Sequence, residues 1–179
     1  MNYRQAYYVF GRYVFLGLIA AFGLPLLYFF LKPLTIYPAL LAIKLFYHNT
    51  FLLPGTNTIY VAGNYVSIIE ACVGVAAYYL LIFLNFTTPM KGIVRVKSLA
   101  FLAFTFLIIN VIRIVLFTGL FVSGYSFFNF AHTVVWYIGS TALIVILWFV
   151  NVFVFKIRKV PVHSDIETLI KQINKSKKR

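Results

Sequence analysis

The sequence predicts an all-α integral membrane protein: a bundle of about four transmembrane helices with an interfacial helix and a small outer β-hairpin. Of its 179 residues, 63% are hydrophobic and only 11% are charged. A soluble domain would carry roughly twice that share of charged residues. The apolar residues also come in long blocks, and a membrane-spanning helix needs roughly 20 of them. We therefore expect one transmembrane domain over residues 1–160 and a basic cytoplasmic tail over residues 161–179.

The apolar blocks with the length of a membrane span are expected to be helical, because only a helix satisfies its own backbone polar groups inside a bilayer. Pro25 is expected to kink the first of them. That first block is expected to stay as an anchor, because no small-residue cleavage site follows it. The blocks run from Tyr13 to Leu31, from Ala71 to Phe86, from Ser98 to Val122 and from Ala131 to Phe155.

The segment from Leu34 to His48 is apolar but contains Lys44, and prolines stand at positions 33 and 38. It predicts a short helix at the membrane interface that starts at Pro38, since proline suits a first helical turn and the segment is too short to span. The alternative is a fifth span, which would move the N-terminus to the other side of the membrane.

Lysine and arginine placement predicts the orientation, because cytoplasmic loops are enriched in both. Basic residues gather before the first span, after the second span and in the tail. We therefore expect a multi-pass protein of the cytoplasmic (inner) membrane with both termini in the cytoplasm. The net charge of +13 then reflects topology and attraction to the anionic lipid bilayer, and nucleic acid is not an expected partner. These basic residues are Arg4, Arg12, Lys91, Arg95, Lys97, Lys156, Arg158, Lys159, Lys171, Lys175, Lys177, Lys178 and Arg179.

Two shorter segments have patterns of their own. Thr58 to Ala62 and Tyr65 to Ile69 are rich in β-branched and aromatic residues, and Gly63-Asn64 separates them. This pattern predicts a β-hairpin on the outer face. In the tail, Ser164 to Glu167 has the capping-box form, which predicts an amphipathic helix on the inner leaflet; a solvated tail is the alternative.

Cys72 is the only cysteine, and it opens the second apolar block within Glu70-Ala71-Cys72-Val73-Gly74. The dipole at a helix N-terminus and any nearby cation would favour a thiolate there. The alternative is that Cys72 is an inert packing residue, since free cysteines are often buried and unreactive. The predicted topology places Cys72 on the non-cytoplasmic face.

Two further residues are expected at the same depth from other helices. Arg113 lies in the outer half of the third span, where an arginine is costly unless it is paired or faces a polar cavity. Asn110 lies one turn before it on the same face. His132 opens the fourth span, and cysteine with histidine is a recurring nucleophile and base pair. Snorkelling of Arg113 and an incidental His132 are the alternatives.

Other kinds of site find no support in the sequence. It has no metal-ligand spacing, no phosphate-binding glycine loop and no paired carboxylates, so neither a metal nor a cofactor is expected. Glu70 is the only carboxylate outside the tail. It is interpreted as a first-turn acid favoured by the helix dipole, with orientation of Arg113 or His132 as the alternative. Ser140 and Thr141 are interpreted as small packing residues between helices.

Taken together, Glu70-Ala-Cys72-Val-Gly74, Asn110-Val-Ile-Arg113 and the downstream His132 resemble the exosortase/archaeosortase family. The resemblance covers residues 57 to 140 and includes the order of loop, cysteine, Asn-x-x-Arg and histidine. One position departs from the family pattern: Val73 stands where serine usually follows the cysteine.

The resemblance implies a membrane cysteine protease or transpeptidase. Cys72 would be the nucleophile, Arg113 and His132 would complete the catalytic set, and Asn110, Glu70 and Gly74 would support it. The implied substrates are exported surface proteins whose C-terminus carries a short motif, a transmembrane helix and a basic cluster. A second hypothesis is a non-catalytic membrane scaffold that assists export of envelope polysaccharide or protein.

Overall fold

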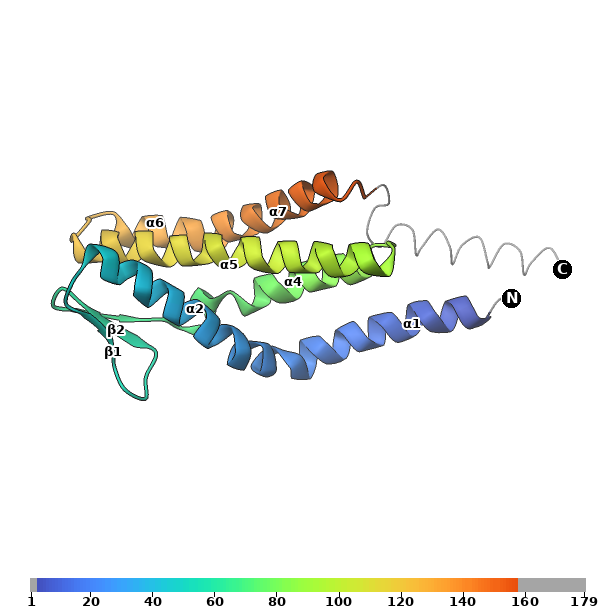
Figure 1. The fold of residues 1–179 in the computed structure, drawn as a ribbon, viewed down its shortest axis with the longest axis horizontal. Coiled ribbons are helices and arrows are strands. Elements are labelled where there is room, and N and C mark those ends of the chain that lie inside the picture. The colour runs from blue at the N-terminus through green and yellow to red at the C-terminus, as the bar shows by residue number, and fades with distance from the viewer. Residues whose placement is uncertain (1–2, 158–179) are drawn as a thin grey trace.

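The helices run along the long axis of the molecule, and a small three-stranded sheet lies at one end of them (Figure 1). The structure is a computed structural model that describes residues 3–157. The first helical elements are α1 (Tyr3–Leu18), the π-helical turn η1 (Ile19–Gly23) and α2 (Leu24–Phe46). Next come the strands β1 (Thr50–Leu52), β2 (Thr58–Val61) and β3 (Asn64–Ser67). The remaining helices are α3 (Glu70–Val73), α4 (Val75–Thr87), α5 (Gly92–Val122), α6 (Phe128–Val134), the π-helical turn η2 (Val135–Gly139) and α7 (Ser140–Val154).

The chain runs back and forth along this axis. The continuous helix from α1 through α2 leads to the sheet, and α3 with α4 returns to the opposite end. Helix α5 runs toward the sheet end again, and α6 to α7 leads away from it (Figure 1). The loop between α4 and α5 therefore lies far from the sheet, whereas the loop between α5 and α6 lies near it.

Three helical stretches within residues 3–157 have the length and composition to cross a membrane. They are Phe10–Phe46, Gly92–Val122 and Phe128–Val154. This confirms a mainly helical chain of the kind found in membrane proteins. Helix α4 is apolar but has only 13 residues, fewer than the roughly 20 of a full span. The count of four spans stays a prediction.

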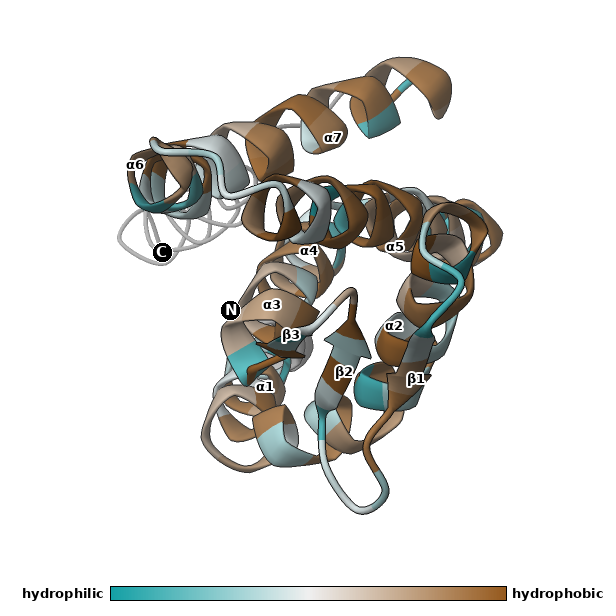
Figure 2. Ribbon diagram, turned by 90° about the vertical axis from the view of Figure 1, so that its left-hand side faces the viewer, coloured by the Kyte–Doolittle hydropathy of each residue, from teal (hydrophilic) through white to brown (hydrophobic). Residues whose placement is uncertain are grey.

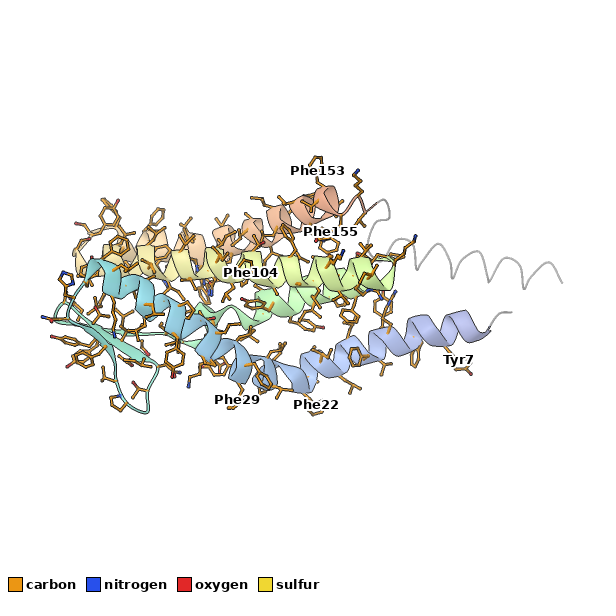
Figure 3. All side chains as sticks on the ribbon, in the orientation of Figure 1. Tyr7, Phe22, Phe29, Phe104, Phe153 and Phe155 are labelled. Atoms are coloured by element: carbon orange, nitrogen blue, oxygen red, sulfur yellow. The ribbon has the colours of Figure 1, made fainter. Side chains whose placement is uncertain are left out.

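Large apolar side chains point outward along the whole length of the helices (Figure 3). Phe22, Phe29 and Phe153 are 77%, 70% and 85% exposed. Soluble monomers rarely leave an apolar surface of this extent in contact with water. The surface between the two ends of the molecule therefore suits hydrocarbon.

The separate interfacial helix predicted from Leu34 to His48 is wrong, because α2 continues without a break to Phe46. Pro33 and Pro38 lie inside this helix. Proline removes a backbone donor, but a membrane helix tolerates it where neighbouring helices pack against it. Here one face of α2 around the prolines is buried, and its residues Ile36, Ala39 and Leu40 belong to a core shared with the sheet, α3 and α5. Ile36 and Ile43 are 3% and 1% exposed, so tertiary packing outweighs the local preference for a break.

The expected kink of the first span is present as the π-helical turn η1. It lies directly before Pro25, and the helix changes direction there (Figure 1). A π-helical turn is one of the recognised causes of a helix bend.

The predicted hairpin is confirmed, with two differences. Its turn consists of Ala62 and Gly63 rather than Gly63 and Asn64, since β2 pairs with β3 through Val61 and Asn64. Both turn residues have positive φ, +45° and +84°, as the hairpin-favouring type I′ turn requires. The Asn64 side-chain amide donates to the Ala62 carbonyl at 3.1 Å. The other difference is an additional strand, β1, which pairs antiparallel with β2.

A buried polar triad ties three helices together at the end far from the sheet. Asn85 of α4 donates to the Ser98 hydroxyl of α5 at 2.7 Å, and that hydroxyl donates to Asn151 of α7 at 2.8 Å. All three side chains are 0% exposed. Side-chain hydrogen bonds of this kind link helices where hydrophobic association is weak. The predicted tail of residues 161–179, including its amphipathic helix, lies outside the described residues.

Candidate functional site

The sequence predicted that Cys72 opens a long helix, and the structure shows that it does not. It is the third residue of α3, a helix of four residues that ends at Gly74. The predicted second span from Ala71 to Phe86 is therefore two helices, and the long one begins only at Val75. The argument that a long helix dipole favours the thiolate thus loses its basis. The Cys72 side chain is half-buried and is a free thiol.

Gly74 is the reason for this break. Its φ of +78° lies in the left-handed region that side chains other than glycine rarely adopt. A Cβ atom there would also lie 3.0 Å from the Phe106 ring of α5. Only glycine satisfies both the turn and this close approach, so Gly74 sets the angle at which α3 presents Cys72.

Asn110 holds the same segment from the side of α5. Its side-chain amide donates to the backbone carbonyl of Cys72 at 2.9 Å and to that of Val73 at 3.2 Å. These carbonyls lie at the C-terminal end of α3, where the break leaves them without partners from a further helical turn. Asn110 is only 1% exposed. Its role in the site is therefore to fix the backbone that carries the thiol.

Arg113 lies on the same helix and is half-buried. Its guanidinium donates to the Ser140 hydroxyl at 2.7 Å. That hydroxyl in turn donates to the Val135 carbonyl at 3.2 Å, within the π-helical turn η2. Arg113 and Cys72 line the same two cavities. A guanidinium has five N–H donors, so the bond to Ser140 leaves others that could bind an anion.

His132 packs in a cluster with two aromatic rings. The Phe117 ring of α5 meets the imidazole edge-on, with a centroid distance of 5.2 Å. The Phe128 ring, one helical turn earlier in α6, stacks on it at 5.6 Å, and the two phenylalanine rings contact each other at 6.1 Å. These ring contacts orient the imidazole and use neither of its nitrogens.

The structure brings the three predicted residues to one place. Cys72, Arg113 and His132 all line a cavity of about 100 Å³. They also line a second cavity of about 290 Å³, which extends along residues 65–69 at the end of the sheet. A nucleophile, a cation and a proton acceptor around one cavity are the groups that acyl transfer requires.

Arg113 connects this centre to two larger cavities. One, of about 740 Å³, lies between α2, α5 and the η2–α7 region and is lined almost entirely by apolar side chains. The other, of about 560 Å³, is lined by residues of α2, α3, α4, α5, η2 and α7. Glu70 is exposed and lines this second large cavity. Within residues 3–157 Glu70 forms no ion pair, so orientation of Arg113 or His132 by this carboxylate finds no support.

Val73, which follows Cys72, points away from the site. Its side chain is 0% exposed and packs in the core with Ile36, Ile59 and Ile114. It lines neither cavity that contains Cys72. The side chain at this position therefore contributes no group to those cavities.

The sequence interpretation missed two contributions to the site. Ser140 is not only a packing residue, because it is the hydrogen-bond partner of Arg113. Its spacing of eight residues from His132 places it two turns further along one helix, a signal that the sequence does contain. The contacts of Phe117 and Phe128 with His132 had no comparable signal in a chain with 20 phenylalanines.

Fold and site together define a largely helical chain with membrane-length helices and a thiol, a guanidinium and an imidazole around one cavity. Comparison of the chain with protein-family models, curated proteins and solved structures found no match.

Proposed function

We propose that this protein is a membrane-embedded cysteine protease or transpeptidase of the exosortase/archaeosortase type. It would process the C-terminal sorting signals of exported surface proteins. The single observation that carries the proposal is the shared cavity of Cys72, Arg113 and His132, which come from three elements far apart in the sequence. Of the motifs around Cys72 and Arg113 that resemble this family, Ala71, Cys72 and Arg113 line this cavity.

The proposed location is the cytoplasmic membrane, with the site on the non-cytoplasmic face and both termini in the cytoplasm. The basic residues Arg95, Lys97 and Lys156 belong to helix ends that lie far from the sheet, whereas Cys72 follows the sheet directly. Cytoplasmic segments are the ones enriched in lysine and arginine. In this orientation, α3 and α4 together form the second of four segments that cross the membrane.

The first half of the proposed reaction forms a thioester. His132 accepts the proton of the Cys72 thiol, and the sulfur attacks the carbonyl carbon of the scissile peptide bond. The Arg113 guanidinium binds the oxyanion that develops. The carbon–nitrogen bond then breaks, His132 returns the proton to the leaving amine, and the C-terminal helix of the substrate departs with a new N-terminus.

The second half transfers the acyl group. Water, or an amine or hydroxyl group of an envelope component, loses a proton to His132 and attacks the thioester carbon. The carbon–sulfur bond breaks, and His132 returns its proton to the sulfur, which regenerates the Cys72 thiol. No hydrogen bond joins the Cys72 sulfur to His132 within residues 3–157. Catalytic hydrogen bonds often tighten only when substrate is bound, which is the state in which this proton transfer takes place.

Co-expression with a candidate substrate tests the proposal. The substrate is an exported protein of the same cell with the motif, helix and basic cluster, tagged on both sides of the motif. The wild-type enzyme should separate the two tags, and Cys72→Ala should abolish separation. Ser123→Ala is the matched control, because its hydroxyl only donates to the Leu120 carbonyl of its own helix. Undiminished processing by Cys72→Ala would favour the non-catalytic scaffold instead.

A further inference from the structure

Strand β3 has a free edge that borders the candidate site. The sheet order is β1-β2-β3, so β3 pairs on one side only. Figure 2 shows β3 on the side of the sheet next to α3, the helix that carries Cys72. Unpaired edges of this kind are templates for a further strand.

The backbone groups on that edge follow from the pairing register. Val61 and Asn64 close the two-residue turn as a bonded pair, and the amide of Ile68 donates to the Asn57 carbonyl at 2.9 Å. Bonded and non-bonded pairs alternate in an antiparallel ladder. Positions 64, 66 and 68 therefore face β2, while the amides and carbonyls of Tyr65 and Ser67 point to the free edge. Within residues 3–157 these groups have no other hydrogen-bond partner.

The cavity of about 290 Å³ runs along this edge to the reactive groups. It is lined by residues 65–69 without a gap, and by Cys72, Arg113 and His132. Successive residues of a strand point to opposite faces of the sheet. Three of these five consecutive residues belong to β3 and two to the extended segment that follows it. They cannot all share one face, so the cavity borders the edge of this segment. Tyr65 and Ile69 are 66% and 58% exposed, so the edge is accessible from outside.

We propose that β3 binds the substrate by strand addition: an extended peptide segment pairs with the free edge of β3 and delivers its scissile carbonyl to Cys72. Main-chain hydrogen bonds provide affinity in this mode of recognition and side-chain pockets provide specificity. This inference rests on the proposed function for the identity of the substrate.

The direction of the added strand is parallel to β3. The chain of β3 runs toward Cys72, because Ile69 ends the extended segment and α3 begins at Glu70. The substrate helix that leaves the reaction lies C-terminal to the scissile bond and belongs to the membrane. The segment on β3 is therefore the part N-terminal to the scissile bond, and it too runs toward Cys72.

The lone cysteine of this chain provides a direct test on the full-length protein in detergent. The probe is acetyl-Thr-Val-Thr-Ala chloromethyl ketone, whose β-branched residues favour an extended conformation. The Cys72 sulfur displaces chloride, forms a carbon–sulfur bond and releases its proton to solvent. Two further probes carry an N-methyl group on adjacent backbone amides. Only one of two adjacent amides can face β3, so only one of these probes should lose a hydrogen bond. That probe should label Cys72 about fivefold more slowly, and the other at the rate of the unmethylated peptide.

Substitutions on the strand test the same contact from the protein side. Ser67→Pro removes the amide on the free edge, and proline is compatible with an edge strand. It should slow labelling by the unmethylated peptide about fivefold. Ser67→Ala loses only the hydroxyl and keeps the amide, so it should be labelled faster than Ser67→Pro; equal rates for the two variants would contradict the role of the amide. Iodoacetamide, which has no peptide backbone, should label both variants and the wild type equally.

Equal labelling by the three peptides would overturn the inference and assign the cavity to lipid or to a second copy of the chain. These labelling rates do not require the protein to cleave anything. If processing survives in Cys72→Ala, the proposed function fails while a difference between the methylated probes still supports peptide binding at β3.

Discussion

Substitution of Gly74 by alanine should destabilise the protein through two separable effects. A left-handed conformation costs a residue other than glycine about 1–2 kcal/mol, and Gly74 has a φ of +78°. The added Cβ would also lie 3.0 Å from the Phe106 ring, which is 2% exposed and has little room to move. Crowding of a packed core costs about 1–3 kcal/mol. The free energy of unfolding should therefore fall by about 2–5 kcal/mol.

Gly124→Ala is the matched control for the backbone effect alone. Gly124 has a φ of +68°, but nothing lies within 4 Å of the position its Cβ would take. It should lose only about 1–2 kcal/mol. Equilibrium unfolding by SDS in mixed micelles, followed by circular dichroism, measures both variants against the wild type. In a Phe106→Leu background the cost of Gly74→Ala should fall toward that of Gly124→Ala. Equal costs for the two glycines in the wild-type background would refute the assigned contact with Phe106.

Further substitutions separate the roles assigned to the site from those assigned to the scaffold. Arg113→Lys keeps a positive charge but loses the planar guanidinium, so substrate processing should fall about 100-fold. Iodoacetamide should still label Cys72 in this variant. Unchanged processing would exclude oxyanion binding by Arg113. Asn110→Ala leaves two carbonyls of α3 without their donor and should lower the free energy of unfolding by about 2–4 kcal/mol in the SDS titration. Ser98→Ala breaks both bonds of the buried triad and should cost about 1–2 kcal/mol, whereas Thr141→Ala, which removes a bond within one helix only, should cost clearly less.

The mainly helical fold, and the position of the site residues at one end of the helices, were predictable from the sequence. Long apolar blocks form helices in hydrocarbon, because a helix satisfies its own backbone polar groups. The basic residues predict which ends of those helices lie on the same side. Cys72, Arg113 and His132 were therefore expected at one end of the bundle. Their contact with one cavity was not predictable, because it depends on the rotation of each helix about its axis. Sequence spacing fixes which residues share a face of one helix, but not which face meets the neighbouring helix.

The sequence predictions that the structure contradicts have a common cause. Each of them followed a local conformational preference of a few residues, which tertiary packing overrides. Pro33 and Pro38 predicted a helix boundary, but the buried Ile36 and Ile43 pack α2 into the core across this region. Gly74 was read as part of a continuous helix, although its contact with Phe106 and its positive φ make it the point where the helix breaks. In the hairpin, Ala62 takes a conformation that alanine normally avoids, with a side-chain hydrogen bond from Asn64 to its carbonyl.

The arrangement of the buried triad explains how such a small bundle can hold three reactive groups in place. Ser98 and Arg113 lie on the same helix, 15 positions apart, or roughly 20 Å at the rise of an α-helix. Asn85 follows Cys72 along α3 and α4, and Asn151 follows His132 along α6 to α7. Each helix that contributes a member of the triad thus belongs to a segment that also contributes a member of the site. The hydrogen bonds of the triad fix the axial register of these segments at one end. Because helices are stiff, that register is transmitted to the other end, where Cys72, Arg113 and His132 line one cavity.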